Sequence, residues 1–158
     1  MSTTAGTLAK QPFLADLTDD QRQRLAAVTS RSTFPAGDRI FRQGSAADQF
    51  WLITNGKVYL DSEVRGYAPF VLETLGQGDV LGWSWLFPPY RWHFGAVAIS
   101  TTEALAFDGA QVRDLCRRDP ALGYELATRF LQVMGNRLQA ARRRLEDCQR
   151  AAGHQPDL

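Results

Sequence analysis

The stretch FPAGDRIFRQGSAADQFWLITNGKVYL, residues 34–60, decides the fold of this chain. Short apolar runs alternate in it with the turn pairs Gly37-Asp38, Gly44-Ser45 and Asn55-Gly56. Because asparagine and glycine both tolerate positive φ, Asn55-Gly56 predicts a two-residue type I′ hairpin between strands at residues 51–54 and 57–61. The stretch therefore indicates a β-rich domain built from short strands.

The same pattern extends outward, from residue 32 to residue 108. More short β-rich runs follow, and Gly66 and the segment Gly76-Gln77-Gly78-Asp79 mark turns between them. Many short strands at this spacing predict an antiparallel sandwich or barrel. The expected fold class is mainly β with flanking helices.

Helix signals stand on both sides of the β-rich region. Thr18 followed by Gln21 forms a capping-box pattern, which predicts a short helix over residues 19–28. Another short helix is expected over 110–117. Asp119 as an N-cap with Pro120 at the first helical position predicts a long helix over about 120–148. Apolar residues spaced by threes and fours give that helix one apolar face: Leu122, Leu126, Phe130, Val133 or Met134, Leu138, Ala141 and Leu145.

Length and charge limit the domain organisation and the partners. The 158 residues fit one domain over 12–148, with a disordered N-terminal tail at 1–11 and a C-terminal tail at 149–158. A net charge of +1 argues against general nucleic-acid or membrane binding. The first residues lack a secretory signal, so a cytoplasmic location is expected. Cys116 and Cys148 are expected to be reduced thiols, and no metal-ligand spacing is present.

The element order and the glycine framework resemble the cyclic-nucleotide-binding domain of the catabolite-activator and fumarate–nitrate-regulator superfamily. The resemblance covers roughly residues 12–148, and the run ALAFD at 104–108 is similar to the strand that closes the family's β-roll. It implies an antiparallel β-roll, or jelly roll, which encloses a ligand, and a C-terminal helix that reports the ligand. The matching positions are Phe34, Gly37, Ile40, Phe41, Gly44, Phe50, Ile53, Gly56, Gly78, Asp79 and Gly82.

The phosphate cassette departs from the family's pattern. Ligand-competent members carry F-G-E-L/I-A-L after the glycine-aspartate turn and R-x-A-S/T after a short loop, whereas residues 81–86 here read LGWSWL. Gly82 is kept, but Trp83 stands where the resemblance implies the glutamate that accepts a ribose hydroxyl, and an indole N–H only donates. With ALAFD as the anchor, Trp92 takes the place of the phosphate-binding arginine and Gly95 that of the small hydroxyl residue. These changes argue against ordinary cyclic AMP or GMP binding.

Two interpretations of the aromatic run over residues 83–94 stay open. Inward-pointing rings would fill the roll and leave a ligand-free dimerising scaffold. Rings that line a void beside Gly82 would make a pocket for an apolar or aromatic ligand, with Arg91 in reach if the loop at Pro88-Pro89 bulges. The candidate ligand-binding residues are Val71, Gly82, Trp83, Ser84, Trp85, Leu86, Arg91, Trp92 and His93.

The expected function is regulatory and not enzymatic. No catalytic motif is present, and His93 is expected to be packed and hydrogen-bonded instead of binding a metal or haem. The ligand would be a cyclic nucleotide or another small molecule, and the signal would pass to a partner protein through the C-terminal helix. No recognition-helix pattern follows that helix, so DNA binding is not expected. A homodimer is expected through Val133, Met134, Leu138, Ala141 and Leu145.

Overall fold

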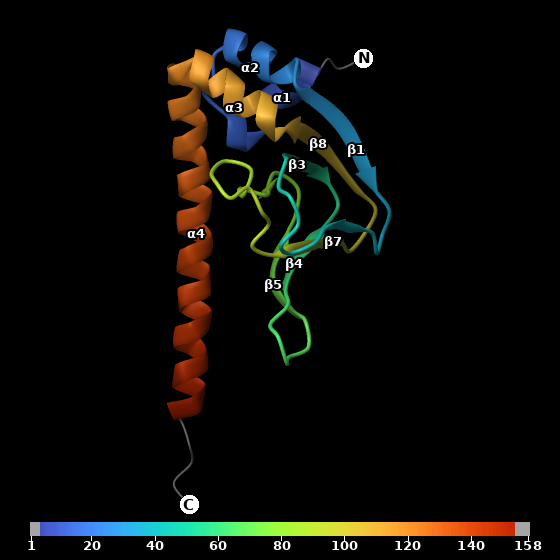
Figure 1. Ribbon diagram of the computed structural model, residues 1–158, viewed down its shortest axis with the longest axis vertical. Helices are drawn as coiled ribbons and strands as arrows, with labels where there is room; N and C mark the ends of the chain where they lie inside the picture. The colour runs from blue at the N-terminus through green and yellow to red at the C-terminus, as the bar shows by residue number, and fades with distance from the viewer. Residues whose placement is uncertain (1–3, 154–158) are drawn as a thin grey trace, which may run out of the picture.

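The structure, a computed structural model, describes residues 4–153 of the chain (Figure 1). Within that range eight strands form two four-stranded antiparallel sheets, which confirms the predicted β-roll. One sheet has the order β1 (Thr29–Phe34), β8 (Thr102–Asp108), β3 (Gln49–Asn55) and β6 (Val80–Leu81). The other has the order β2 (Arg39–Phe41), β7 (Gly95–Ala98), β4 (Val58–Ser62) and β5 (Phe70–Leu75).

Helices cover one end and one side of the roll. Figure 1 shows α1 (Thr4–Ala9), α2 (Asp19–Ala26) and α3 (Gly109–Arg118) gathered at one end, with a short 3-10 helix at Pro12–Leu14 between the first two. From the same end, α4 (Pro120–Gly153) runs along the side of the roll, past the level of the β4–β5 hairpin. The long C-terminal helix therefore forms one side of the domain and runs alongside the roll.

The helix starts follow the predicted caps. The backbone N–H of Gln21 donates to Thr18 Oγ1 at 3.1 Å, and the backbone N–H of Thr18 donates to Gln21 Oε1 at 3.0 Å, which completes the capping box. The Asp119 carboxylate accepts from the backbone N–H of Leu122 at 3.2 Å, with Pro120 in the first helical position. Both predictions of helix N-termini are confirmed.

Both predicted tails need correction. Residues 4–9 form α1 instead of a disordered segment, because Leu8 is fully buried and ties this turn to the core. At the other end α4 continues past residue 148 to Gly153, since Ala151 and Ala152 are strong helix formers. The expectations for residues 1–3 and 154–158 lie outside the described residues.

The predicted hairpin at Asn55-Gly56 is wrong. β3 pairs with β8 and β6, whereas β4 pairs with β5 and β7, so this turn is a corner between the two sheets. Of the two turn residues, only Gly56 has a positive φ, at 105°. A Cβ at Gly56 would lie 2.7 Å from the Thr101 carbonyl oxygen and the Thr102 Cα, so the close approach of that backbone also requires glycine.

The buried residues form two clusters, one on each side of the β3 sheet. The helix core packs the helices on the roll, and it includes the near half of the α4 stripe: Leu8, Leu14, Leu17, Leu25, Phe50, Leu52, Val80, Trp85, Leu105, Phe107, Val112, Leu122, Leu126 and Phe130. The roll core fills the space between the sheets: Phe41, Ala47, Trp51, Ile53, Val58, Leu60, Leu75, Leu81, Trp92, Phe94, Ala96, Ala104 and Ala106. The second cluster occupies the space in which a β-roll would hold a ligand.

Candidate functional site

The cassette glycine is covered by an aromatic ring. Gly82 follows β6 with a φ of 95°, and residues 83–86 turn away from the sheet instead of continuing the strand. A Cβ at Gly82 would lie 2.7 and 2.8 Å from two ring carbons of Trp92. The space over Gly82, where the family resemblance places a phosphate, is thus occupied by the Trp92 indole.

Trp92 is an integral part of the roll core. Its side chain is 3% exposed, and its ring stacks on Phe41 with centroids 3.8 Å apart and planes 12° apart. The backbone holds it in place, because the Gly44 N–H donates to the Trp92 carbonyl at 2.8 Å and the Trp92 N–H donates to the Ser45 carbonyl at 2.9 Å. The position of the family's arginine therefore carries a fixed apolar ring.

Arg91 does not replace the missing arginine in this structure. It is exposed, and its guanidinium donates to the Gly44 carbonyl at 3.0 Å on the outside of the roll. Ala46 and Arg91 form an isolated antiparallel bridge, which fixes the direction of this segment. Since neighbouring residues of an extended segment face opposite sides, the inward Trp92 sends Arg91 outward.

Gly95, at the position of the small hydroxyl residue, makes room for an ion pair. Arg39 and Asp61 form two parallel hydrogen bonds of 2.9 Å each across it, and the Asp61 side chain is 8% exposed. That bidentate hydrogen bonding to Asp61 raises the pKa of the Arg39 guanidinium. A Cβ at Gly95 would lie 2.3 Å from Asp61 Oδ1, so even a serine would displace the pair.

The other cassette residues divide between the helix core and the surface of the roll. Trp85 is fully buried and stacks on Phe50 at 4.6 Å, and its indole N–H has no hydrogen-bond partner among residues 4–153. Leu86 packs partly buried against the same helix core. Both residues thus face the helices, not a ligand space inside the roll.

Ser84 and His93 form a local pair. The Ser84 Oγ lies 3.0 Å from His93 Nδ1, and the His93 ring stacks on Trp83 with centroids 4.8 Å apart. His93 is therefore hydrogen-bonded and stacked on Trp83, although its side chain is exposed. Trp83 itself is half-buried and contacts both cores, so it stands at their common edge.

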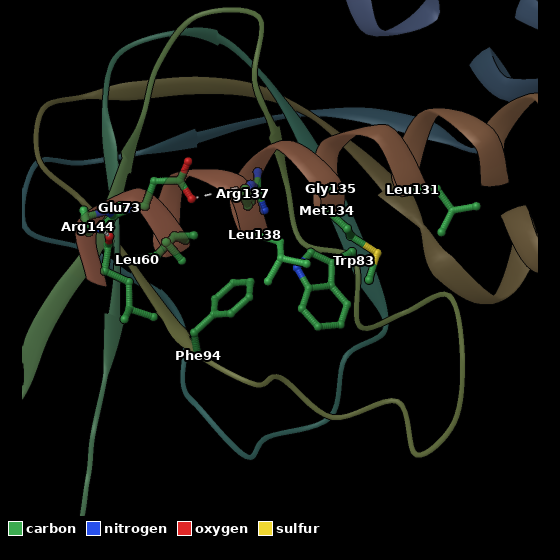
Figure 2. A pocket seen from close by; sticks show the side chains of 12 residues that line it. Leu60, Glu73, Trp83, Phe94, Leu131, Met134, Gly135, Arg137, Leu138 and Arg144 are labelled. Carbon is green, nitrogen blue, oxygen red and sulfur yellow. Dashed lines mark hydrogen bonds and ion pairs between the residues drawn. The ribbon is translucent and has the colours of Figure 1, made fainter. Parts of the chain in front are cut away.

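A large open groove lies between α4 and the β4–β5 side of the roll (Figure 2). Its volume is about 710 Å³. We call it the α4 groove, and its lining consists of Leu60, Leu72, Glu73, Trp83, Phe94, Leu131, Met134, Gly135, Arg137, Leu138, Ala141 and Arg144. Most of these side chains are apolar, so the groove suits an apolar ligand body.

Two arginine side chains that line this groove join α4 to the roll. The side chain of Arg137 is 14% exposed, its Nε lies 3.6 Å from Glu73 Oε2, and a second nitrogen donates to the Val80 carbonyl. Burial lowers the pKa of Arg137, while Glu73 and Asp79 oppose that shift; its Nη1 has no hydrogen-bond partner within the described range. Arg144 donates to the Leu72 carbonyl. These contacts fix the far half of α4 to β5 and β6.

The predicted site residues are only partly brought together. Of the ligand candidates Trp83 lines the α4 groove, and so do Met134, Leu138 and Ala141 from the predicted dimer face. Val71 is 56% exposed, whereas its neighbour Leu72 lines the groove. Val71 does not line the groove, because alternate residues of a strand face opposite sides.

The residues of the predicted dimer face differ in their exposure. Val133 packs partly buried against the helix core, so only part of its side chain is accessible. Leu145 is 60% exposed, as are its counterparts one and two heptads earlier, Leu138 at 70% and Leu131 at 66%. Four residues that line the α4 groove were not among the predicted site residues: Leu131, Glu73, Arg137 and Arg144. Arg137 had a signal: it comes seven residues after Phe130 and so lies on the packed side of the helix.

The cysteines and the acidic residues give no second site. Burial foremost, and then the nearby Asp119, raise the pKa of the Cys116 thiol, which is the opposite of what an activated thiol needs. Within residues 4–153 no group of histidine, cysteine and carboxylate side chains is arranged to hold a metal ion. Over the same range no helix is both long and apolar enough to span a membrane.

Comparison with known proteins places the chain in a family. The model of the cyclic nucleotide-binding domain matches residues 31–119, more than half of the chain. The chain therefore belongs to the cyclic nucleotide-binding domain family, and its matched relatives include a transcriptional regulator and a protein kinase regulatory subunit. This agrees with the resemblance carried by the glycine framework.

Curated relatives and solved structures agree with the family. The chain is 28% identical to the cyclic AMP receptor protein of Thermus thermophilus over 82% of its own length and 58% of the relative's. It is 27% identical to a cyclic AMP-activated global transcriptional regulator of Mycobacterium tuberculosis over 78% of its length and 54% of the relative's. A putative cyclic nucleotide-binding protein from Geobacter metallireducens superposes with a TM-score of 0.77 at 27% identity, covering 85% of this chain and 98% of that one. The chain thus spans a little over half the length of these curated relatives.

Proposed function

We propose that this chain is a sensory domain that binds a small molecule in the α4 groove and signals to a partner protein through α4. It would be regulatory, not catalytic, and it would not use its phosphate cassette. The observation that carries the proposal is the Trp92 ring over Gly82, beside an open groove of about 710 Å³. The Trp92 ring argues against a cyclic-nucleotide phosphate at Gly82, and the groove offers another place for a ligand.

The groove is well placed to couple a ligand to α4. Its lining comes from the roll on one side and from α4 on the other, so an occupant contacts both. Up to Phe130, α4 is anchored by the fully buried Leu122 and Leu126 of the helix core, whereas Leu131, Leu138 and Leu145 are exposed. A ligand that binds one position of this far half better than another will shift the helix toward that position.

The test compares cyclic nucleotides with an apolar probe on the whole chain. We expect no calorimetric signal from cyclic AMP or cyclic GMP, and we expect octan-1-ol to bind and change the emission of Trp83. Gly135→Leu should abolish the alcohol's binding, because Gly135 lines the groove and a Cβ there meets nothing within 4 Å. Gly153→Leu is the matched control, since it places the same side chain in open space at the end of α4.

Two results would contradict the proposal. Micromolar binding of a cyclic nucleotide would mean that the Trp92 ring moves aside and that the cassette still holds a phosphate. Equal loss of octan-1-ol binding in both leucine variants, or no binding in the wild type, would remove the groove as the sensor site.

A second candidate function is a constitutive dimerising scaffold, with the aromatic-filled roll as a passive body. The exposed apolar residues of α4 favour it, because Tyr124, Leu131, Leu138 and Leu145 follow one another at steps of seven. Met134 and Ala141 lie between them at the second heptad position. This is the pattern by which two helices pair as a coiled coil, so the proposed partner of this face is α4 of a second copy.

The oligomeric state tests this dimer. Leu138→Asp should give monomers in sedimentation velocity, because it places a charge in the centre of the seam; Gln139→Asp on the neighbouring face should leave the dimer intact. An unchanged dimer in Leu138→Asp would contradict the proposed seam. A stable dimer that binds no probe in the groove would favour the scaffold over the sensor.

A further inference from the structure

Resting on the proposed function, we infer that the ligand of the α4 groove is an amphipathic anion: an apolar body with one negatively charged head group that binds Arg144. The inference depends on how the lining residues are distributed along the groove. In Figure 2 Glu73 and Arg144 lie at one end of the groove together with Leu60, Arg137 lies near the middle, and Trp83 and Leu131 lie toward the other end.

The apolar end takes the body of the ligand. In Figure 2 Trp83 and Phe94 from the roll face Met134 and Leu138 from α4. Phe94 is 7% exposed and Trp83 is half-buried, so both rings present edges or faces to the groove while they remain packed in the roll. Rings opposite flexible aliphatic side chains form a surface that accepts alkyl or aryl groups of varied shape.

The other end carries an excess of positive charge. Glu73, Arg137 and Arg144 all line the groove, so two guanidinium groups face one carboxylate. Glu73 lies beside the buried Arg137 and offsets its charge. Arg144 is exposed and donates to a neutral backbone carbonyl, that of Leu72, and no carboxylate of residues 4–153 lies within ion-pair distance of it.

These observations select the charge of the ligand. One uncompensated guanidinium at the mouth of an apolar groove favours a single carboxylate, with which arginine forms two parallel charge-assisted hydrogen bonds. A cation would meet Arg144 with like charge, and a neutral alcohol would gain only the apolar contact. The head group would sit at the end away from Trp83, and therefore away from the cassette glycine next to it.

Three probes of equal chain length separate these cases on the whole protein: octanoate, octan-1-ol and octylammonium. Dissociation constants would be measured from the tryptophan emission and by calorimetry. We expect octanoate to bind about tenfold more tightly than octan-1-ol, because its carboxylate adds charge-assisted hydrogen bonds to an exposed guanidinium, where solvent weakens them. Octylammonium should bind more weakly than the alcohol.

Arg144→Gln tests the proposed head-group contact, and Arg143→Gln is its matched control. Arg143 is the adjacent residue and does not line the groove. Arg144→Gln should reduce octanoate affinity to that of octan-1-ol while leaving the alcohol's affinity unchanged, which shows that the groove itself is intact. Arg143→Gln should keep the preference for octanoate.

The outcomes distinguish this inference from the proposed function. Equal affinities for octanoate and octan-1-ol, or tighter binding of octylammonium, overturn the anionic ligand and leave the groove as a sensor site. The same loss in Arg143→Gln and Arg144→Gln also overturns it, because the preference would then reflect the general charge of α4. Binding of none of the three probes contradicts the sensor groove and the ligand class together.

Discussion

The interior of the roll and the α4 groove are two neighbouring candidate ligand spaces, of which the first is filled by side chains and the second is open. Inside the roll, Trp92 stacks on Phe41 and covers Gly82, so the space is filled by the chain's own rings. In the groove, Trp83, Leu138 and their neighbours line about 710 Å³ of open volume. The difference teaches that a family's glycine framework preserves the fold, whereas the ligand space depends on a few side chains.

Trp92→Ala should have the largest effect on stability. It would remove the ring that fills the roll and so leave an open space there, as in the α4 groove. Removing a buried tryptophan costs about 3–5 kcal/mol of unfolding free energy. Urea denaturation would measure the loss. Trp83→Ala is the comparison variant, and its half-buried ring should cost less. If Trp92→Ala costs under about 1 kcal/mol, the roll interior is not tightly packed and the contrast fails.

Gly95→Ser would sharpen the comparison by restoring the family's hydroxyl in the roll. We expect a loss of about 2–3 kcal/mol, because the new side chain displaces the bidentate Arg39–Asp61 pair and leaves a buried carboxylate without its partner. Thermal or urea unfolding would report it. Gly76→Ser is the control, since a Cβ there would have its nearest atom 4.0 Å away. Similar stability of both variants would show that the pair contributes little.

Arg137→Met should act on the groove and spare the roll. The variant removes the contacts to Glu73 and Val80 but keeps much of the apolar packing of the stem, so we expect a loss of about 1 kcal/mol. Amide exchange should accelerate in the far half of α4 and remain unchanged in β3. Arg142→Met, which breaks an exposed pair with Glu146, is the control. Uniform acceleration across the protein would contradict a local role for Arg137.

The smallest expected effect is a difference in alkylation rate between the two thiols, one in a packed part of the helices and one in an exposed part. Cys116 is half-buried with a raised pKa, whereas Cys148 is exposed. A raised pKa means less thiolate at a given pH, so iodoacetamide at pH 8 should label Cys148 first. Labelling of Cys116 should increase as the pH rises further. Mass spectrometry of a time course would detect the order, and faster labelling of Cys116 would contradict it.

Local patterns in the sequence predicted local structure well. The caps at Thr18 and Asp119 depend on residues three apart in the chain, and both form as expected. The alignment on ALAFD placed Trp92 at the arginine position, and Trp92 does face the cassette glycine. Asn55-Gly56 failed as a hairpin, because the assignment of β3 and β4 to different sheets depends on distant partners.

The groove lay beyond sequence reasoning for a different reason. It exists only because α4 lies beside β5, and no periodicity in either segment fixes that placement. Leu72 lines the groove and Val71 does not, a choice that the strand's alternation leaves undetermined until one face is known. Glu73 and Arg144 look like ordinary surface charges in the sequence for the same reason, whereas the seven-residue step from Phe130 places Arg137 on the packed side of α4.

Gly135, which opens the groove in the middle of α4, also weakens the helix at that point, since a glycine inside a helix is less stable than alanine by about 1 kcal/mol. Once the contacts of Arg137 and Arg144 to the roll are released, the segment from Gly135 to Gly153 can pivot at Gly135, beside the ligand. At a rise of 1.5 Å per residue it is about 27 Å long. A tilt of about ten degrees at Gly135 would move the C-terminal end of α4 by about 5 Å. A small displacement at the groove would therefore become a larger change of position that a partner protein can detect.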